Sequence, residues 1–475
     1  MKRLFLILSC GWLAGCAHYQ SQPLAPDKTA AQLESRRLDD PGLKTFLEEN
    51  LGQALPTWPE TNWNFQELTL VAFYYHPSLE VARDQWLVAT AGIKTAGARP
   101  NPSVSVSPAY DTQIPGNYSP WLVPVTLDIP IETAGKRGKR LAEAEKLAEA
   151  ARWNFASAVW TIRSGVRNRL LEWQTAGRRA GWLQQQFETQ TKIVARLQQR
   201  FAAGGIARPE LTIAQIALHK TQQDLSDAQS KKNTALAQLA EALGVTTAAL
   251  DGIAFESEPP LMDAEQLTSA EARGMALRSR ADILAALANY AAAEAELRLQ
   301  IAKQYPDLHL GPGYAWNSGN AGDNEWSLGL TVELPILDQN QGPIAEAEAQ
   351  RKLAGAKFIE LQAQVIGEID RAVAGLHLAQ EQLAAGDAML AAEQQQQKSA
   401  QAQLDAGAAD QVDWLNAQLE LTSAALARLE NEAKLQEAFG QLEDALQSPL
   451  TLPDSAIRKL QKNPRESQRV SNHEP

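Results

Sequence analysis

The chain has 475 residues, which is long enough for two or three ordinary domains. It carries 44 Lys and Arg residues against 56 Asp and Glu residues, and the resulting net charge of −12 argues against a general nucleic-acid-binding surface. Aromatic residues make up only 6% of the chain, whereas Ala, Gln, Glu and Leu dominate long stretches, as is typical of long helices. Both cysteines, Cys10 and Cys16, lie near the N-terminus, so we expect neither a disulfide nor a thiolate metal site in the body of the protein.

The first 15 residues have the pattern of a secretory signal peptide. Lys2 and Arg3 precede an apolar run that ends in Leu-Ala-Gly-Cys, a sequence that resembles the bacterial lipobox. The resemblance implies cleavage before Cys16 and acylation of that cysteine, and two or three acyl chains anchor a protein firmly. Ala17 favours the outer membrane over retention at the inner membrane. The alternative is an ordinary leader with a chance cysteine. No later stretch of about 18 uninterrupted apolar residues follows, so we expect no transmembrane helix.

The body of the chain contains an internal duplication, which appears as three pairs of segments at nearly one offset. The pairs are 101–110 with 305–314 (offset 204), 127–131 with 332–336 (offset 205), and the segments that begin at Gly204 and Gly407 (offset 203). Each half predicts a helix, a strand, a loop, a strand, a long helix, a turn and a helix. The expected divisions are a signal peptide (1–15), a lipidated segment (16–60), two repeats (61–260 and 261–447) and a polar tail (448–475).

Two very long helices are predicted, over about 139–201 and 342–405. The first contains no proline and is rich in good helix formers, and at 1.5 Å per residue it would be roughly 90 Å long. Shorter helices over 210–243 and 411–446 return along them, with apolar residues at alternating spacings of three and four that indicate coiled-coil packing. A generic antiparallel helical hairpin has the same pattern, so the pattern does not itself show a tunnel.

Four segments between the helices alternate apolar and polar residues, as strands with two different faces do. They are 103–107, 123–129, 307–316 and 326–334. Each strand is expected to be about ten residues long around its alternating segment, which is the length that crosses a bilayer when tilted. Aromatic residues near the loop ends predict an interfacial belt: Tyr110, Trp121, Trp316 and Trp326. A soluble sandwich alternates as well. If the strands span a membrane, four cannot close a barrel, so the chain must oligomerise, although this argument does not choose between two, three and four copies.

Together these features resemble the TolC family of outer-membrane efflux channels, in its lipoprotein branch, over about residues 60–447. The matching motifs are 76–79 with its degenerate repeat 280–283, the strand segments 127–131 and 332–336, and the two helix-tip segments. The resemblance implies a mainly α fold with a small β part: a coiled-coil α-helical barrel in the periplasm, plus four strands per protomer that complete a 12-stranded β-barrel across the outer membrane. It also implies a homotrimer that contacts outer-membrane lipid and docks to a periplasmic adaptor and an inner-membrane pump.

The stretch 131–140 resembles the outer subunits of cobalt–zinc–cadmium resistance-nodulation-division systems. The function expected from the resemblance is a passive exit channel for heavy-metal cations. Drugs, solvents or secreted proteins are alternative cargoes. A lipid-anchored periplasmic coiled-coil protein with a structural role is the alternative from a different class.

The gate candidates follow from the same resemblance, since acidic side chains line the narrow periplasmic end in the family. Asp413 matches the family's tip motif, Asn416 stands where a second aspartate often occurs, Glu210 is the repeat equivalent of Asp413, and Asp410 lies just before the helix. In a ring these carboxylates would repel one another or attract cations. Helix N-capping is an equally good interpretation of Asp413 and the better one of Asp410, and one residue can do both.

The sequence contains no arrangement that indicates an enzyme, a cofactor site or a metal site. The six histidines are scattered without metal-ligand spacing, and the four methionines form no relay. His309 falls on the polar side of its strand and is a candidate for lining a lumen.

Overall fold

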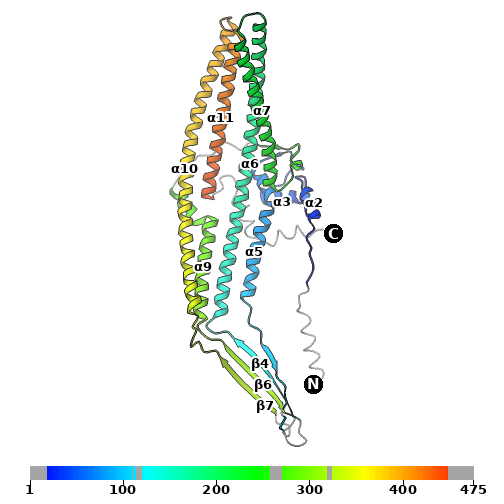
Figure 1. The fold of residues 1–475 in the computed structure, drawn as a ribbon, viewed down its shortest axis with the longest axis vertical. Helices are drawn as coiled ribbons and strands as arrows, with labels where there is room; N and C mark the ends of the chain where they lie inside the picture. The colour runs from blue at the N-terminus through cyan, green and yellow to red at the C-terminus, as the bar shows by residue number, and fades with distance from the viewer. Residues whose placement is uncertain (1–18, 111, 114–119, 257–269, 318–323, 448–475) are drawn as a thin grey trace.

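The structure is a computed structural model that describes residues 19–110, 112–113, 120–256, 270–317 and 324–447. The predicted signal peptide, the lipidation candidate Cys16 and the C-terminal tail lie outside the described residues. The described chain is elongated, with a helical part that ends in two hairpin turns and a small sheet at the opposite end (Figure 1).

The helices, in chain order, are α2 (Pro26–Glu34), α3 (Pro41–Leu51), α4 (Phe65–Tyr75), α5 (Pro77–Ala96), α6 (Lys136–Ala202), α7 (Arg208–Leu243), the 3-10 helix η1 (Thr247–Leu250), α8 (Ala270–Ser279), α9 (Ala281–Ala302), α10 (Gln341–Asp405) and α11 (Gln411–Leu446). The strands are β1 (Asn62–Trp63), β2 (Ser103–Val106), β3 (Ala109–Tyr110), β4 (Trp121–Ile131), β5 (Ala254–Phe255), β6 (Leu308–Asn317) and β7 (Asn324–Val332).

The predicted long helices and their returning partners are confirmed. α6 has 67 residues and α10 has 65, while α7 and α11 have 36 each. Gly204 and Gly407 adopt left-handed backbone conformations directly after the long helices, as helix-ending glycines do. The end of α7 requires glycine for a further reason, because a Cβ on Gly244 would lie 2.9 Å from the carbonyl oxygen of Tyr75.

The helices form two connected rows. Near the sheet, α5, α6, α9 and α10 pack in that order, and towards the hairpin turns α7, α6, α11 and α10 do so. α5 and α7 therefore follow one another along α6, and α9 and α11 follow one another along α10 (Figure 1). In both rows α10 forms one edge, and a helix of the first repeat forms the other.

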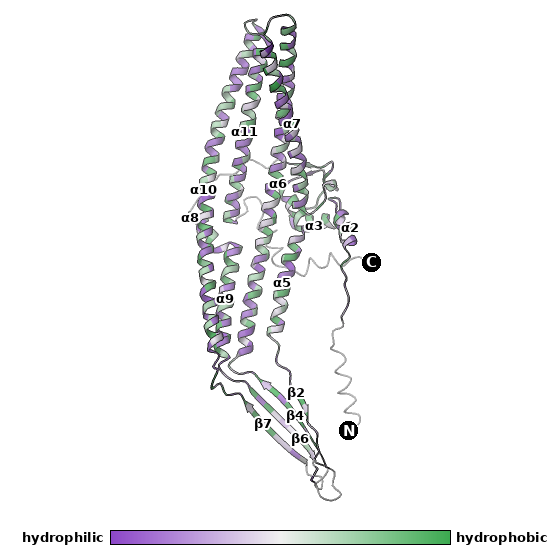
Figure 2. Ribbon diagram, in the orientation of Figure 1, coloured by the Kyte–Doolittle hydropathy of each residue, from purple (hydrophilic) through white to green (hydrophobic). Residues whose placement is uncertain are grey.

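The two largest buried clusters lie one where the N-terminal segment packs on the first repeat and one within the second repeat. One cluster buries residues of α3, α4, α6 and α7, and a second buries residues of α9, α10 and α11. Arg36 fixes the N-terminal segment to the first cluster by donating to the carbonyls of Tyr75 (2.7 Å) and Gly244 (2.8 Å). Hydropathy elsewhere alternates along the helices in short bands, as expected for amphipathic packing (Figure 2).

The main sheet is antiparallel with the order β2-β4-β6-β7, and β3 also pairs with β4. Its register confirms the predicted faces. Val106 of β2 pairs with Val125 of β4, which in turn pairs with Tyr314 of β6, and the three side chains share the apolar face. Thr126 and Gly313 are paired on the polar face.

The sheet differs from the prediction at several strand ends. β4 extends beyond the predicted 123–129 at both ends. β2 ends at Val106, and the chain pairs with β4 again as β3 only after Pro108, which cannot donate a ladder hydrogen bond. β7 ends at Val332 rather than at residue 334, because its partner β6 begins at Leu308, directly opposite Val332. The small parallel pair β1–β5 at mid-length was not predicted. No helix in the described part of the chain is long and apolar enough to span a bilayer.

Candidate functional site

The gate candidates lie at the hairpin turns, the end of the molecule farthest from the sheet (Figure 1). An apolar cluster beneath the turns joins α6, α7 and α11 through Ile193, Leu197, Leu211 and Leu415. This cluster holds the first turns of the returning helices against the last turns of α6, so the acidic residues in those turns have defined positions.

Asp410 and Asp413 form a capping box at the start of α11. The Asp410 carboxylate accepts the backbone N–H of Val412 at 2.5 Å and that of Asp413 at 3.3 Å, and the Asp413 carboxylate accepts the backbone N–H of Asp410 at 3.2 Å. The capping interpretation of these residues is confirmed, since the bonds satisfy helix-end donors that otherwise lack partners. The gate interpretation stays a prediction.

Arg200, in the last turn of α6, is the tip residue that sequence analysis missed. Its guanidinium forms an ion pair with Asp410. This bond raises the pKa of Arg200, and the charges of Asp413 and Glu210 raise it further. Three gate candidates therefore stabilise the charge of one guanidinium. A basic residue at a helix C-terminus opposite an acidic N-cap was the available signal.

The same ion pair favours the ionised form of Asp410. Burial raises the pKa of the Asp410 carboxyl, but the Arg200 ion pair and the backbone N–H bonds from Val412 and Asp413 outweigh burial, so the pKa lies below its ordinary value. Asp410 is therefore a carboxylate at neutral pH. Asn416 is exposed one turn after Asp413 on the same face of α11.

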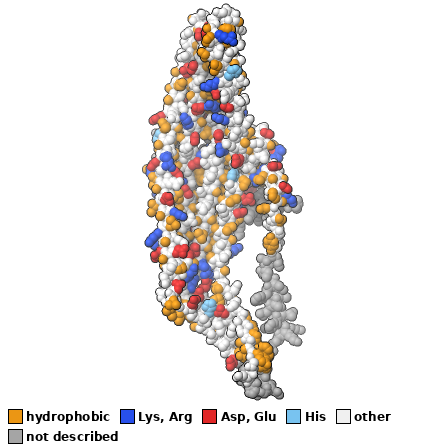
Figure 3. All heavy atoms as spheres, viewed as in Figure 1, with side chains coloured by type: hydrophobic (Ala, Val, Ile, Leu, Met, Phe, Trp, Pro, Cys, Tyr) orange, Lys and Arg blue, Asp and Glu red, His pale blue; other side chains and the backbone are white. Residues whose placement is uncertain are grey.

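The predicted aromatic residues gather at the loop end of the sheet. Tyr110 and Trp121 lie opposite each other with ring centroids 5.1 Å apart, and Tyr314 packs on Trp326 at 4.8 Å. Trp316 is 53% exposed and Trp326 is 82% exposed. Figure 3 shows hydrophobic side chains gathered near this end, whereas charged side chains are spread along the helical part. The arrangement fits an interfacial belt, which stays a prediction.

The basic stretch after β4 connects the sheet to the helices. Lys136 pairs with Asp307 at 2.8 Å, which joins the start of α6 to the start of β6. Arg137 and Arg140 donate to backbone carbonyls at the C-terminal end of α5. These carbonyls have no partner within their own helix, so the basic side chains stabilise the junction of α5 with α6.

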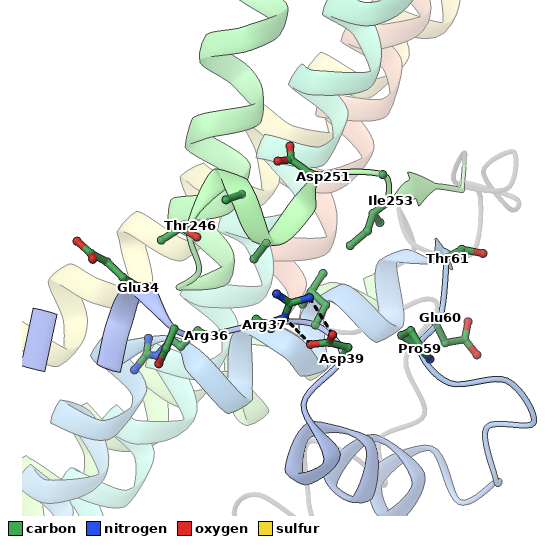
Figure 4. Close-up of a pocket in the computed structure, with 15 residues that line it drawn as sticks. Glu34, Arg36, Arg37, Asp39, Pro59, Glu60, Thr61, Thr246, Asp251 and Ile253 are labelled. Carbon is green, nitrogen blue, oxygen red and sulfur yellow. Dashed lines mark hydrogen bonds and ion pairs between the residues drawn. The ribbon is translucent and has the colours of Figure 1, made fainter. Parts of the chain in front are cut away.

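A cleft of about 470 Å³ lies beside the end of α2, at mid-length of the molecule (Figure 1), and Figure 4 shows its lining residues in close-up. Three segments line it, namely 34–39, 59–61 and residues between 246 and 253. The Arg37–Asp39 ion pair lies within it, at 2.8 Å and largely exposed. The cleft follows the boundary along which the N-terminal segment packs on the end of the first repeat, and none of the predicted site residues lines it.

Comparison with known proteins agrees with this architecture. The family described as outer membrane efflux protein matches twice, over residues 73–245 and 272–447, one match per repeat. The cobalt-zinc-cadmium resistance protein CzcC of Cupriavidus metallidurans is 26% identical over 279 residues, which are 56% of this chain and 62% of CzcC. The chain thus aligns with about three fifths of the length of this relative.

Two solved outer membrane proteins share the fold. The CmeC outer membrane channel of Campylobacter jejuni superimposes with a TM-score of 0.68 at 18% identity, over 94% of this chain and 99% of CmeC. VceC of Vibrio cholerae gives a TM-score of 0.66 at 19% identity, over 80% of this chain and 95% of VceC. The mainly helical fold and the small sheet are therefore those of a known outer membrane channel, and the two family matches show the duplication. The chain belongs to the outer membrane efflux protein family, a family of channel proteins rather than enzymes.

Proposed function

We propose that this protein is the lipid-anchored outer-membrane exit channel of a tripartite efflux system, and that it works as a homotrimer. Twelve strands from three copies form a barrel across the membrane, and the helices form a periplasmic tunnel that docks to an adaptor and an inner-membrane pump. The channel itself changes no covalent bond. It supplies an aqueous path and a gate for cargo that the pump delivers.

The observation that carries this proposal is that the sheet and both helical rows of the described protomer have open edges. The sheet ends in β2 and β3 on one side and β7 on the other, and the helical rows end in α5 or α7 on one side and α10 on the other. An open strand edge is not stable in lipid, because its backbone groups have no partners there. A ring of copies that joins one edge to the other removes all of these edges at once.

Apolar side chains on both helical edges support ring closure. Val81 and Val88 of α5 are 57% and 73% exposed, and Leu353 and Ile359 of α10 are 55% and 66% exposed. Exposed apolar side chains on two edges that meet in a ring are expected to be buried in the assembly. The edges differ from each other, so the contact is head-to-tail, as a closed ring requires.

The duplication predicts the register of the contact between copies. Within one chain, Ile129 of β4 lies opposite Leu310 of β6. The repeat equivalents of these residues are Leu334 and Val106, at the offsets of 205 and 204. We therefore expect Leu334 of one copy to lie opposite Val106 of the next. This pairing explains why both side chains are exposed in the protomer, at 68% and 55%.

Cysteine cross-linking tests the ring. The double variant Leu334→Cys, Val106→Cys should form covalent trimers on oxidation of outer-membrane fractions, seen as a reducible ladder in non-reducing gels. The pair Leu334→Cys, Val104→Cys is the control, because it is displaced along the strand by two residues, about 7 Å. A monomer that is soluble once Cys16 is replaced would contradict the channel and support the structural coiled-coil alternative.

The gate is proposed at the hairpin turns, where Asp410, Asp413, Glu210 and Asn416 would form rings in the trimer. Asp413→Ala should alter single-channel conductance or cation block in planar bilayers, because it removes one carboxylate from each copy. Asn416→Ala changes side-chain size at another proposed ring position without a change of charge, so comparison of the two variants separates the effect of charge from that of size. Unchanged conductance of Asp413→Ala would remove Asp413 from the gate.

For the cargo we propose divalent heavy-metal cations. The support is the similarity to CzcC, whose name states cobalt, zinc and cadmium resistance. The stretch 131–140, which resembles the outer subunits of cobalt–zinc–cadmium systems, adds to it. Deletion of the gene should increase sensitivity to zinc, cobalt or cadmium and leave sensitivity to dyes and detergents unchanged. The opposite pattern would assign the channel to organic compounds.

A further inference from the structure

His309 and Asp128 form a cross-strand pair on the polar face of the sheet. His309 lies at the start of β6 opposite Pro130 of β4, and Asp128 lies two residues away on the same face. The His309 Nδ1 atom is 3.0 Å and 3.1 Å from the two carboxylate oxygens of Asp128. Both side chains are about half exposed, at 42% and 48%, so the pair borders open space rather than the protein core.

The carboxylate fixes the tautomer of the imidazole. A carboxylate accepts a hydrogen bond and cannot donate one when ionised, so Nδ1 of His309 carries the proton. The other ring nitrogen, Nε2, then has a free lone pair. Metal-ligating histidines usually donate their other ring N–H to a carboxylate, a backbone carbonyl or a water, and such a partner orients the ring and increases its basicity as a ligand.

We infer that the His309–Asp128 pair is a weak binding site for a borderline divalent cation, such as Zn²⁺, Co²⁺ or Cu²⁺, on the lumen wall at the periplasmic end of the barrel. His309 Nε2 is the ligand, and Asp128 is the positioning residue. This inference rests on the proposed function, because the polar face lines a lumen only in the closed ring. Imidazole nitrogen suits these cations better than Mg²⁺ or Ca²⁺, which prefer oxygen.

The surroundings explain why binding is weak. Glu333 is exposed just beyond β7, two residues from Thr331, which pairs with His309. Asp307, two residues before His309, is occupied by its ion pair with Lys136. Among the described residues, no group of three or more His, Cys, Asp and Glu side chains is arranged to hold a metal. Water must complete the coordination, and a site with few protein ligands releases its ion readily, as conduction requires.

The test measures cation binding by a route that does not depend on export. Cu²⁺ added to the detergent-solubilised trimer should give an electron paramagnetic resonance spectrum with nitrogen hyperfine structure, and His309→Gln should lose it. Zn²⁺ should block single-channel current in planar bilayers with an affinity that His309→Gln abolishes. Asp128→Asn should weaken the block by about tenfold or more while the trimer stays intact, since it leaves the ligand but weakens its orientation.

The matched controls are His219→Gln and His377→Gln, which alter exposed histidines on α7 and α10. If these variants lose the copper signal and the zinc block while His309→Gln retains both, the inference is wrong. It is equally wrong if the wild-type trimer conducts ions but binds no metal through nitrogen at His309. Absence of any ion current from the wild-type trimer would instead refute the proposed channel. The copper spectrum would still show whether His309 binds a metal ion.

Discussion

Gly440 of α11 lies directly against the guanidinium of Arg167 on α6. A Cβ atom at position 440 would be 2.5 Å from both the Cζ and the Nε atoms of Arg167. Arg167 is buried and donates to Glu443 at 2.7 Å and to Asp444 at 2.6 Å. Glycine at this position is therefore what allows a charged side chain of the first repeat to reach the carboxylates of the second.

Gly440→Ala should destabilise the protein, although alanine is the better helix former. The added methyl group displaces Arg167 from its ion pairs, and overpacking of this kind costs about 1–3 kcal/mol. Gly181→Ala on α6 is the control, because a Cβ there meets no atom within 4 Å. That variant should be stabilised by up to about 1 kcal/mol. Thermal unfolding followed by helical circular dichroism measures both. Equal shifts of the midpoint for the two variants would contradict the steric explanation.

Glu443→Ala should cause a larger loss of stability than any exposed ion-pair variant. Glu443 is 4% exposed, and its carboxylate accepts hydrogen bonds from Arg163 at 2.6 Å and from Arg167 at 2.7 Å. Its removal leaves the buried guanidinium of Arg163 without its carboxylate partner and leaves Arg167 paired with Asp444 alone, at a cost of about 3–5 kcal/mol.

The control for Glu443→Ala is Glu430→Ala, whose partner Arg179 is 37% exposed. An exposed pair of this kind contributes about 1 kcal/mol at most. We expect Glu443→Ala to be depleted from the membrane fraction and Glu430→Ala to accumulate normally. Similar yields and unfolding midpoints for the two variants would show that the buried network does not stabilise the contact between repeats.

The sequence predicts the elements well because each is specified locally. Uninterrupted helix formers define α6 and α10, and strict alternation defines β4, β6 and β7. The end of β7 could not be predicted in the same way, because it depends on where its partner strand begins rather than on its own side chains.

The contacts that join distant segments also lay beyond sequence reasoning. Arg163 and Arg167 look like ordinary charged residues of an amphipathic helix, yet they are buried against a helix 276 or more residues away. For the same reason the partner of His309 was missed, since Asp128 becomes its neighbour only through sheet register. Of the candidate site, the sequence located the acids of the hairpin turns but not the cation, Arg200, on which they act.

Protein stability should decrease as the pH rises from about 4.5 to about 7, in part through Glu143. The pKa of the Glu143 carboxyl is raised from 4.5 to about 7. Burial is the largest cause, a hydrogen bond to Glu296 on α9 and the charge of Glu296 act in the same direction, and Lys303 opposes them. In this pH range the unfolded chain releases a proton that the folded chain retains, so the folded state loses its advantage with increasing pH.

Glu143→Gln should remove this part of the pH dependence. Glutamine still donates to Glu296 but never ionises, so the variant should unfold at a higher temperature than the wild type at pH 8 and at nearly the same temperature at pH 5. Glu145→Gln, an exposed neighbour on α6, should follow the wild-type profile. A pH profile of Glu143→Gln that is parallel to that of the wild type would contradict the assignment.

Arg200→Ala should change the state of the hairpin turns without unfolding the helices. The variant removes the ion pair between the end of α6 and the cap of α11, and it leaves Asp410, Asp413 and Glu210 without the cation on which all three act. Repulsion among carboxylates then favours a wider mouth, so planar bilayers should show a higher open probability or conductance and stronger block by divalent cations.

The control for loss of a tip cation outside this group is Arg196→Ala. Arg196 lies one turn earlier on α6 and is hydrogen-bonded to Gln199 at 3.1 Å. Because Asp410 retains its backbone bonds, the helical content should be unchanged, and lowering the pH until Asp410 is protonated should reduce the difference between Arg200→Ala and the wild type. Equal conductance of Arg200→Ala, Arg196→Ala and the wild type at neutral pH would show that the Arg200–Asp410 pair has no part in gating.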